Sequence, residues 1–159
     1  MMLIGGALYA IVEDWGSVLF RSISFHIVSA LAGFVLIFLA FRAAATGGRE
    51  LAKGRVGDIP RLETNQLVTS GIFSCMRHPM LFGLTLLPMG WALLLGSPTF
   101  ILYLAPAEML FIVMMVLVFE EMEIQRKFGV AYEKYRQQVP MVSFRPHCLK
   151  QLLGFGKGV

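Results

Sequence analysis

The sequence predicts an all-α fold, a polytopic helical membrane bundle. Three stretches are apolar over membrane-spanning length, residues 23–45, 79–95 and 99–119, and a transmembrane helix needs about 20 such residues. The composition agrees, because 57% of the residues are hydrophobic and 15% are charged, whereas soluble domains average about 25% charged residues. The length of 159 residues fits a single membrane domain, residues 1–159.

Each span has local signals. Residues 23–45 carry Arg42 near one end, where its long side chain can reach the membrane interface. Residues 79–95 form a span of marginal length. A Gly-Ser-Pro turn at 96–98 connects it to residues 99–119, so these two helices should form an antiparallel helical hairpin.

Polar or short segments flank the spans. Residues 46–78 form a glycine-rich loop of a length that is uncommon in the absence of a function. The region 120–159 opens with an amphipathic helix, in which apolar residues recur at helical spacing between lysines and arginines until Pro140. Residues 1–20 are apolar but short, which favours a short helix at the outer interface and leaves a fourth span with a buried acidic pair as the alternative.

Basic residues concentrate in two regions, five in residues 46–78 and seven in residues 120–159. By the positive-inside rule, both regions should lie on the cytoplasmic side. A net charge of +4 is compatible with a nucleic-acid binder, but membrane orientation explains the same residues better, and no nucleic-acid partner is predicted.

The cysteines and histidines suggest neither a disulfide nor a metal centre. Cys75 and Cys148 both lie in the predicted cytoplasmic regions, where thiols stay reduced. The three histidines are far apart in the sequence, and there is no HxxxH or CxxC motif, so we predict no metal site.

Charged residues occur on both sides of the hairpin, at its predicted cytoplasmic ends. Arg77 and His78 precede Pro79, which favours the first turn of a helix, and they could hold a carboxylate or phosphate or serve as a topology anchor. Glu120 and Glu121 follow the third span, and they could bind a cation or pair with Arg77. Together the two pairs suggest a ligand with an amino-acid-like group.

Glu108 lies in the middle of the third predicted span, two residues after Pro106. A carboxylate within a membrane is a functional hypothesis by default. It could contact a polar substrate head group or accept its proton. The structural alternative is a hydrogen bond to a neighbouring helix, where proline has freed backbone groups.

Two motifs resemble a known superfamily. The stretch LVTSGIFSCMRHPMLFG at 67–83 and, after the hairpin, EEMEIQRKFGVAYEKYRQQVP at 120–140 resemble the isoprenylcysteine carboxyl methyltransferase and phospholipid methyltransferase superfamily. The pattern there is LVTxGxY…RHPxYxG, a helical hairpin and EExxxxxxFGxxYxxYxxxVP. The resemblance covers about residues 65–146, roughly half of the chain. It implies a small helical membrane bundle that binds S-adenosylmethionine between the RHP loop, the hairpin and the C-terminal helix.

The resemblance also implies site residues. The expected cofactor contacts are Gln66, Leu67, Val68, His78, Pro79 and Glu120, and further cofactor-binding candidates at motif positions are Phe73, Leu81 and Glu121. The catalytic candidates are Arg77, from the motif, and Glu108, from its place in the membrane. Two positions where the superfamily has tyrosine hold Phe73 and Leu81. Val116 stands where isoprenylcysteine enzymes have an arginine, which argues against an isoprenylcysteine substrate.

These features predict a membrane methyltransferase that uses S-adenosylmethionine and a lipophilic or interfacial acceptor, which could be a prenylated carboxyl compound, a lipid amine or a thiol. Methyl transfer is an in-line displacement that needs alignment and a dry site more than an acid or base. One alternative is a reductase related to sterol reductases that uses NADPH, although Gly83-Leu84 replaces their Gly-Asp. The other is a non-enzymatic membrane subunit. The expected partners are the lipid bilayer and a lipid or lipophilic substrate.

Overall fold

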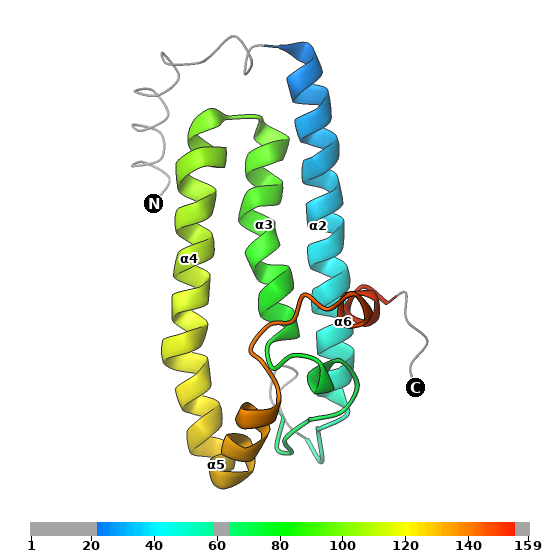
Figure 1. The fold of residues 1–159 in the computed structure, drawn as a ribbon, viewed down its shortest axis with the longest axis vertical. Coiled ribbons are helices and arrows are strands. Elements are labelled where there is room, and N and C mark those ends of the chain that lie inside the picture. Colours follow the sequence, from blue (N-terminus) through cyan, green and yellow to red (C-terminus); the bar gives the residue numbers. More distant parts are fainter. Residues whose placement is uncertain (1–21, 59–63, 155–159) are drawn as a thin grey trace. The chain divides into compact units, whose positions relative to one another are not determined.

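Helices make up the regular structure of the computed structural model, which describes residues 22–58 and 64–154. No strand occurs among these residues (Figure 1), and the all-α prediction is confirmed. The elements in chain order are α2 (Ile23–Ala52), η2 (Gly71–Ser74), α3 (Pro79–Leu95), η3 (Phe100–Leu104), α4 (Ala105–Met115), η4 (Val116–Glu120), α5 (Glu121–Gln138) and α6 (Pro146–Leu152). The predicted segment 1–20 lies outside the described residues.

Two helices are long and apolar enough to cross a membrane, α2 with 30 residues and the helical segment Phe100–Gln138 with 39 residues. The helix α3 between them is equally apolar but has 17 residues. Large apolar side chains on α2 and α4 are exposed, among them Phe34, Phe38, Leu110 and Phe111. Exposed apolar surface of this kind is expected where a helix faces lipid.

The helix α2 continues to Ala52, whereas the sequence predicted a polar loop from residue 46. Glycines at 47 and 48 favour a loop by intrinsic propensity, because glycine is a poor helix former. At Gly47, a Cβ atom would lie 2.6 Å from Cγ of Met80. The missing side chain therefore allows Met80 to pack against the backbone of α2, and this tertiary contact outweighs the local preference.

The described chain forms two compact units. The first contains residues 22–40 and 85–113. Within it α2 and α3 pack backbone to backbone, since a Cβ atom at Gly33 would lie 2.7 Å from the carbonyl oxygen of Gly90. The Ser29 hydroxyl donates a hydrogen bond to the carbonyl oxygen of Leu93, 2.6 Å away. Small residues and serine hydroxyls are the usual means of joining helices in a membrane.

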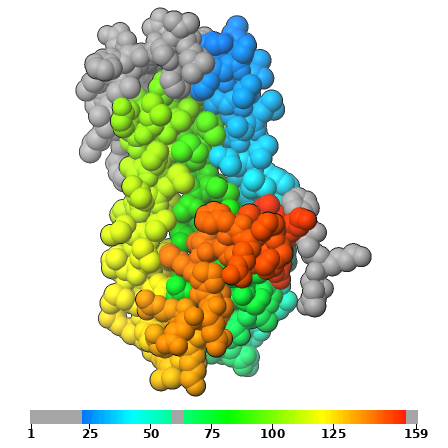
Figure 2. Space-filling model, viewed as in Figure 1, coloured from blue at the N-terminus to red at the C-terminus, as the bar shows by residue number. Residues whose placement is uncertain are grey.

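The second unit contains residues 41–58, 64–84 and 114–154. Its core joins α2, η2 and α6 through the buried residues Ala43, Ile72, Phe73, Met76, Cys148 and Leu152. Arg42 donates from Nε and Nη2 to the carbonyl oxygen of Leu153, at 3.0 and 2.7 Å, and so satisfies the C-terminal end of α6. In the space-filling view, α6 and the segment before it, orange to red, form the surface beside the green residues around η2 (Figure 2).

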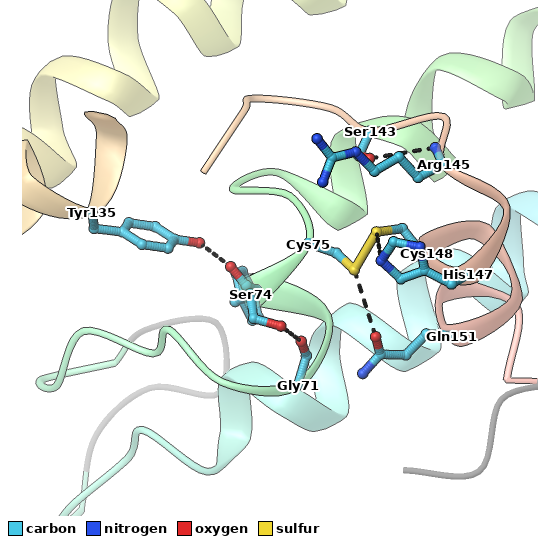
Figure 3. The surroundings of a disulfide bond; sticks show 10 residues. Gly71, Ser74, Cys75, Tyr135, Ser143, Arg145, His147, Cys148 and Gln151 are labelled. Atoms are coloured by element: carbon cyan, nitrogen blue, oxygen red, sulfur yellow. Dashed lines mark hydrogen bonds between the residues drawn. A yellow bond between two sulfur atoms is a disulfide. The ribbon is translucent and has the colours of Figure 1, made fainter. Parts of the chain in front are cut away.

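The two cysteines correct a prediction. Cys75, directly after η2, and Cys148, in α6, form a disulfide bond, with their Cα atoms 5.7 Å apart (Figure 3). The expectation that both remain separate thiols is wrong for this structure. The two residues are separated by 73 positions in the sequence, and nothing local to either one indicated the pairing, which comes from packing α6 on the segment after η2.

Candidate functional site

Gly129 brings two distant parts of α5 together. Its φ of 51° and ψ of −127° are not helical, and a residue with a Cβ atom would be strained at that positive φ. In a straight helix, the 11 positions between Glu121 and Tyr132 would separate these residues by roughly 16 Å along the axis. In the structure the Tyr132 hydroxyl donates a hydrogen bond to Oε1 of Glu121 at 2.7 Å. The break at Gly129 therefore folds the end of α5 back onto its start.

Glu121 is the centre of a buried polar cluster. Arg77 Nη1 lies 2.6 Å from Oε1 and 2.7 Å from Oε2 of this carboxylate. His78 Nε2 lies 2.6 Å from Oε1, and Arg136 Nε lies 3.8 Å from Oε2. The side chains of Glu121 and Arg77 are only 9% and 10% exposed. A carboxylate at this depth is tolerable because cations and hydroxyl donors surround it.

The backbone fixes the position of the Arg77-His78-Pro79 triplet. The Arg77 N–H donates to the carbonyl oxygen of Pro140 at 3.0 Å, and the His78 N–H donates to that of Met141 at 3.1 Å. Pro79 is the first residue of α3, where its missing N–H costs nothing. The triplet is thus held between the start of α3 and the segment that follows α5.

His78 connects both acidic residues. Its Nδ1 lies 3.4 Å from Oε1 of Glu120, and its Nε2 lies 2.6 Å from Oε1 of Glu121. Burial alone would lower the pKa of His78, but hydrogen bonds to the two carboxylates and their negative charges outweigh it, so that the pKa is raised above its ordinary value. Hydrogen bonds on both ring nitrogens suit an imidazolium, which donates from each of them.

We expect the stability of the protein to fall as the pH rises through the raised pKa of His78. A raised pKa in the folded state means that the stabilisation is fully present below the ordinary histidine pKa of about 6.5 and is lost above the folded-state value. The test is the thermal unfolding midpoint in detergent as a function of pH. His78→Gln should flatten this profile and His26→Gln, the control, should not. Equal profiles for the wild type and His78→Gln would contradict the assignment.

A pocket of about 350 Å³ lies beside Glu121, within the range of small-molecule sites. Its lining combines two cations, a carboxylate, an amide and two apolar side chains: Arg126, Arg136, Glu121, Gln125, Leu117 and Met122. In the described part of the chain, Oε1 of Gln125 is buried without a hydrogen-bond partner. The pocket can therefore accept a ligand that has an anionic group, a hydrogen-bond donor and an apolar part.

Four of the predicted site residues come together, namely Arg77, His78, Glu120 and Glu121. An ion pair between the acidic pair and Arg77 is one of the alternatives that the sequence allows, and the structure has this pair at Glu121. The Glu120 side chain is 48% exposed, and its Oε1 lies 3.4 Å from Nδ1 of His78. Glu108 lies in the first unit, exposed on α4.

The other predicted cofactor residues have structural contacts of their own. Gln66 donates its N–H to the carbonyl oxygen of Gly54 at 3.2 Å, and Val68 packs on the core of the second unit. Leu67 is half-buried, while Pro79 and Leu81 are buried in the first turn of α3. The carbonyl oxygen of Phe73 accepts a hydrogen bond from the Tyr135 hydroxyl at 2.6 Å. Their contact with a cofactor stays a prediction.

Sequence reasoning missed the contributions of Tyr132, Gln125, Arg126 and Arg136 to the cluster and the pocket. The Tyr132 side chain is 1% exposed and donates a hydrogen bond to Glu121. Reading the segment as one straight helix placed Tyr132 and Arg136 far from Glu121, whereas Gln125 lies only one turn after it. Gly129 was the available signal, because glycine inside a helical pattern marks a break.

The comparison with known families assigns the chain to a family. Residues 27–131 match the family described as phospholipid methyltransferase, and this match covers 105 of the 159 residues, about two thirds of the chain. No curated protein and no solved structure matches the chain significantly. The matched range contains Arg77, His78 and both glutamates. The chain therefore belongs to the phospholipid methyltransferase family, a family of membrane methyltransferases within the isoprenylcysteine carboxyl methyltransferase-like superfamily.

Proposed function

We propose that the protein transfers the methyl group of S-adenosylmethionine to a lipophilic or interfacial acceptor. The observation that supports this proposal is the buried cluster of Arg77, His78 and Glu121. It lies beside a pocket that is lined by both cationic and anionic side chains. The amino-acid end of S-adenosylmethionine carries a carboxylate and an ammonium group. Such a zwitterion needs partners of both signs within a few ångströms.

The residues around the pocket fit that group. Arg126 and Arg136, which line the pocket, can bind the carboxylate. Glu120 directly precedes the lining residue Glu121, and its side chain is 48% exposed beside His78. The orphan Oε1 of Gln125 can accept a hydrogen bond from the ammonium or a hydroxyl. Leu117 and Met122 offer apolar contact. When bound, the cofactor supplies an electrophilic methyl group on a sulfonium.

The residues of the chain would then act by position and charge. Glu121 is already neutralised by Arg77 and His78, so we assign it to holding the cluster together, and we assign Glu120 to binding the cationic ligand. A displacement at a methyl group gains most from alignment and exclusion of water. This assignment makes Arg77 a positioning residue rather than a general acid.

For the acceptor, we propose a lipid amine or another lipophilic nucleophile that reaches the protein from the bilayer. The support is the family, together with the exposed apolar surfaces of α2 and α4. Glu108, exposed on α4, is the candidate contact for a polar head group, because a carboxylate within an apolar helix favours a cationic or hydrogen-bonding partner. The chain would be a multi-pass protein whose cofactor site faces the cytoplasm, as the charge distribution predicts.

We expect S-adenosylhomocysteine to stabilise the purified protein and NADPH to have no effect. A ligand that binds only the folded state adds about 2.7 kcal/mol at a hundredfold excess over Kd. The cluster and the pocket provide partners for one carboxylate and one ammonium group, whereas a dinucleotide needs cations for several phosphates. The measurement is the shift in thermal unfolding midpoint in detergent. Stabilisation by NADPH alone would favour a reductase, and no response to either ligand would favour a non-enzymatic subunit.

Glu120→Gln should weaken the binding of S-adenosylhomocysteine by about tenfold to a hundredfold, which corresponds to the loss of one charge-assisted hydrogen bond. The fold should persist, because the Glu120 side chain is half-exposed and lies 3.4 Å from His78. Isothermal titration in detergent gives the affinity. Glu123→Gln, three residues further and exposed on α5, is the matched control. Unchanged affinity in Glu120→Gln would contradict the proposal that Glu120 binds the cationic ligand.

A further inference from the structure

A second cluster of potential metal ligands lies where α6 packs on the segment before Arg77, and none of its members lines the pocket beside Glu121. Cys75, Cys148 and His147 have their ligand atoms within 4.8 Å of one another. Cys75 follows η2, whereas His147 and Cys148 lie in the first turn of α6 (Figure 3). We propose that, once the disulfide is reduced, these three side chains form a binding site for a soft divalent cation, Zn²⁺.

The distances suit a small tetrahedral ion. Nε2 of His147 lies 3.1 Å from Sγ of Cys148, and Oε1 of Gln151 lies 3.7 Å from Sγ of Cys75. Zinc bonds of about 2.3 Å to sulfur and about 2.0 Å to nitrogen put neighbouring ligands roughly 3.3–3.8 Å apart. The Cα atoms of the cysteines are 5.7 Å apart, so both thiolates can reach one ion. The amide oxygen of Gln151 or a water would complete four ligands.

The donor set favours zinc on chemical grounds. Thiolates with an imidazole select zinc or cuprous ions over magnesium and calcium, which prefer oxygen ligands. Cys148 is 1% exposed, and a buried thiolate needs a compensating cation. The exposed His147 and the half-buried Cys75 leave one side of the cluster open, which provides the entry path that a metal site requires.

Oxidation state would decide whether the site exists. A dithiol reductant breaks the sulfur–sulfur bond, supplies two electrons and two protons, and is itself oxidised to a disulfide. Zn²⁺ then replaces the protons of the two thiols. In the disulfide form neither sulfur is a thiolate, so the same residues cannot hold the ion. The disulfide and the zinc ion are thus two alternative crosslinks between α6 and the segment that precedes Arg77.

The experiment compares zinc retention by the oxidised and the reduced protein. Each form is incubated with ZnCl₂ in detergent and passed through a desalting column under argon, and the bound zinc is measured by atomic emission. We expect one zinc ion per chain in the reduced protein and none in the oxidised protein. Cobalt in place of zinc should give the charge-transfer absorption of thiolate ligation. Because neither measurement involves methyl transfer or cofactor binding, its result is independent of the proposed enzyme function.

Three variants distinguish a built site from adventitious binding. Cys148→Ser should abolish zinc retention. His147→Ala should weaken zinc binding at least tenfold while the cobalt–thiolate band persists. Because His147 is exposed and Cys148 is buried, His147→Ala should disturb folding less than Cys148→Ser. Lys150→Ala, exposed on the same helix, is the control and should bind like the wild type. Equal retention by the oxidised protein, unchanged affinity in His147→Ala, or no zinc in the reduced wild type would each overturn the proposal.

Discussion

Arg77→Met should lower the free energy of unfolding by about 3 kcal/mol or more, a typical cost of removing one partner of a buried ion pair. The methionine fills most of the space but leaves the carboxylate of Glu121, 9% exposed, without the Nη1 of Arg77 that bonds to both of its oxygens. His78 and Tyr132 remain within hydrogen-bond distance, which keeps the loss near the lower end of the usual range. Reversible unfolding in mixed micelles gives the free energy.

The control for this substitution is Arg145→Met, at an exposed position of the same unit, where a change within about 0.5 kcal/mol is expected. The double variant Arg77→Met/Glu121→Leu should recover part of the lost free energy of unfolding, because it removes both charges and leaves no unpaired buried carboxylate. If Arg77→Met behaves like Arg145→Met, then the Arg77–Glu121 pair contributes little, and the cluster is not a rigid centre of the second unit.

The second large effect concerns the disulfide. Cys75→Ala/Cys148→Ala should lower the free energy of unfolding by about 4 kcal/mol, because a crosslink between residues 73 positions apart restricts the unfolded chain strongly. Unfolding of the oxidised wild type and the double variant is compared in the presence of EDTA, so that no metal contributes.

Reduction of the wild type in EDTA serves as the matching control. It should produce a similar loss without changing any side chain, whereas reduction of the double variant should change nothing. A wild type whose stability is the same before and after verified reduction would show that α6 is held by its buried contacts, such as Leu152, and by Arg42.

Some of the fold is readable from the sequence because it depends on neighbouring residues. Proline in the first helical turn and the Gly-Ser-Pro turn are local signals, and α3 begins at Pro79 and ends at Leu95 just before that turn. The extension of α2 to Ala52, by contrast, does not depend on neighbouring residues. It depends on Met80, 33 positions after Gly47, and no property of residues 46–52 predicts that contact.

The site, like the fold, could be predicted from the sequence only in part. The sequence placed Arg77, His78 and the two glutamates near one another because both segments adjoin predicted spans. It could not say which glutamate is buried, since adjacent residues point about 100° apart around a helix and the rotation depends on the whole packing. Here the π-helical turn Val116–Glu120 leads into Glu121, and such a turn rotates the side chains of the next helical residues about the axis. The buried position then belongs to Glu121.

The contacts of Glu121 also imply an order of assembly. Its bond to Tyr132 spans 11 positions, while its bond to Arg77 spans 44, and short loops close at a lower entropic cost than long ones. During synthesis the cationic segment emerges first, and its backbone partners Pro140 and Met141 emerge only after the bend at Gly129. Until residues 140 and 141 have left the ribosome, Arg77 and His78 lack these backbone partners, so the site can close only after the bend at Gly129 has been synthesised.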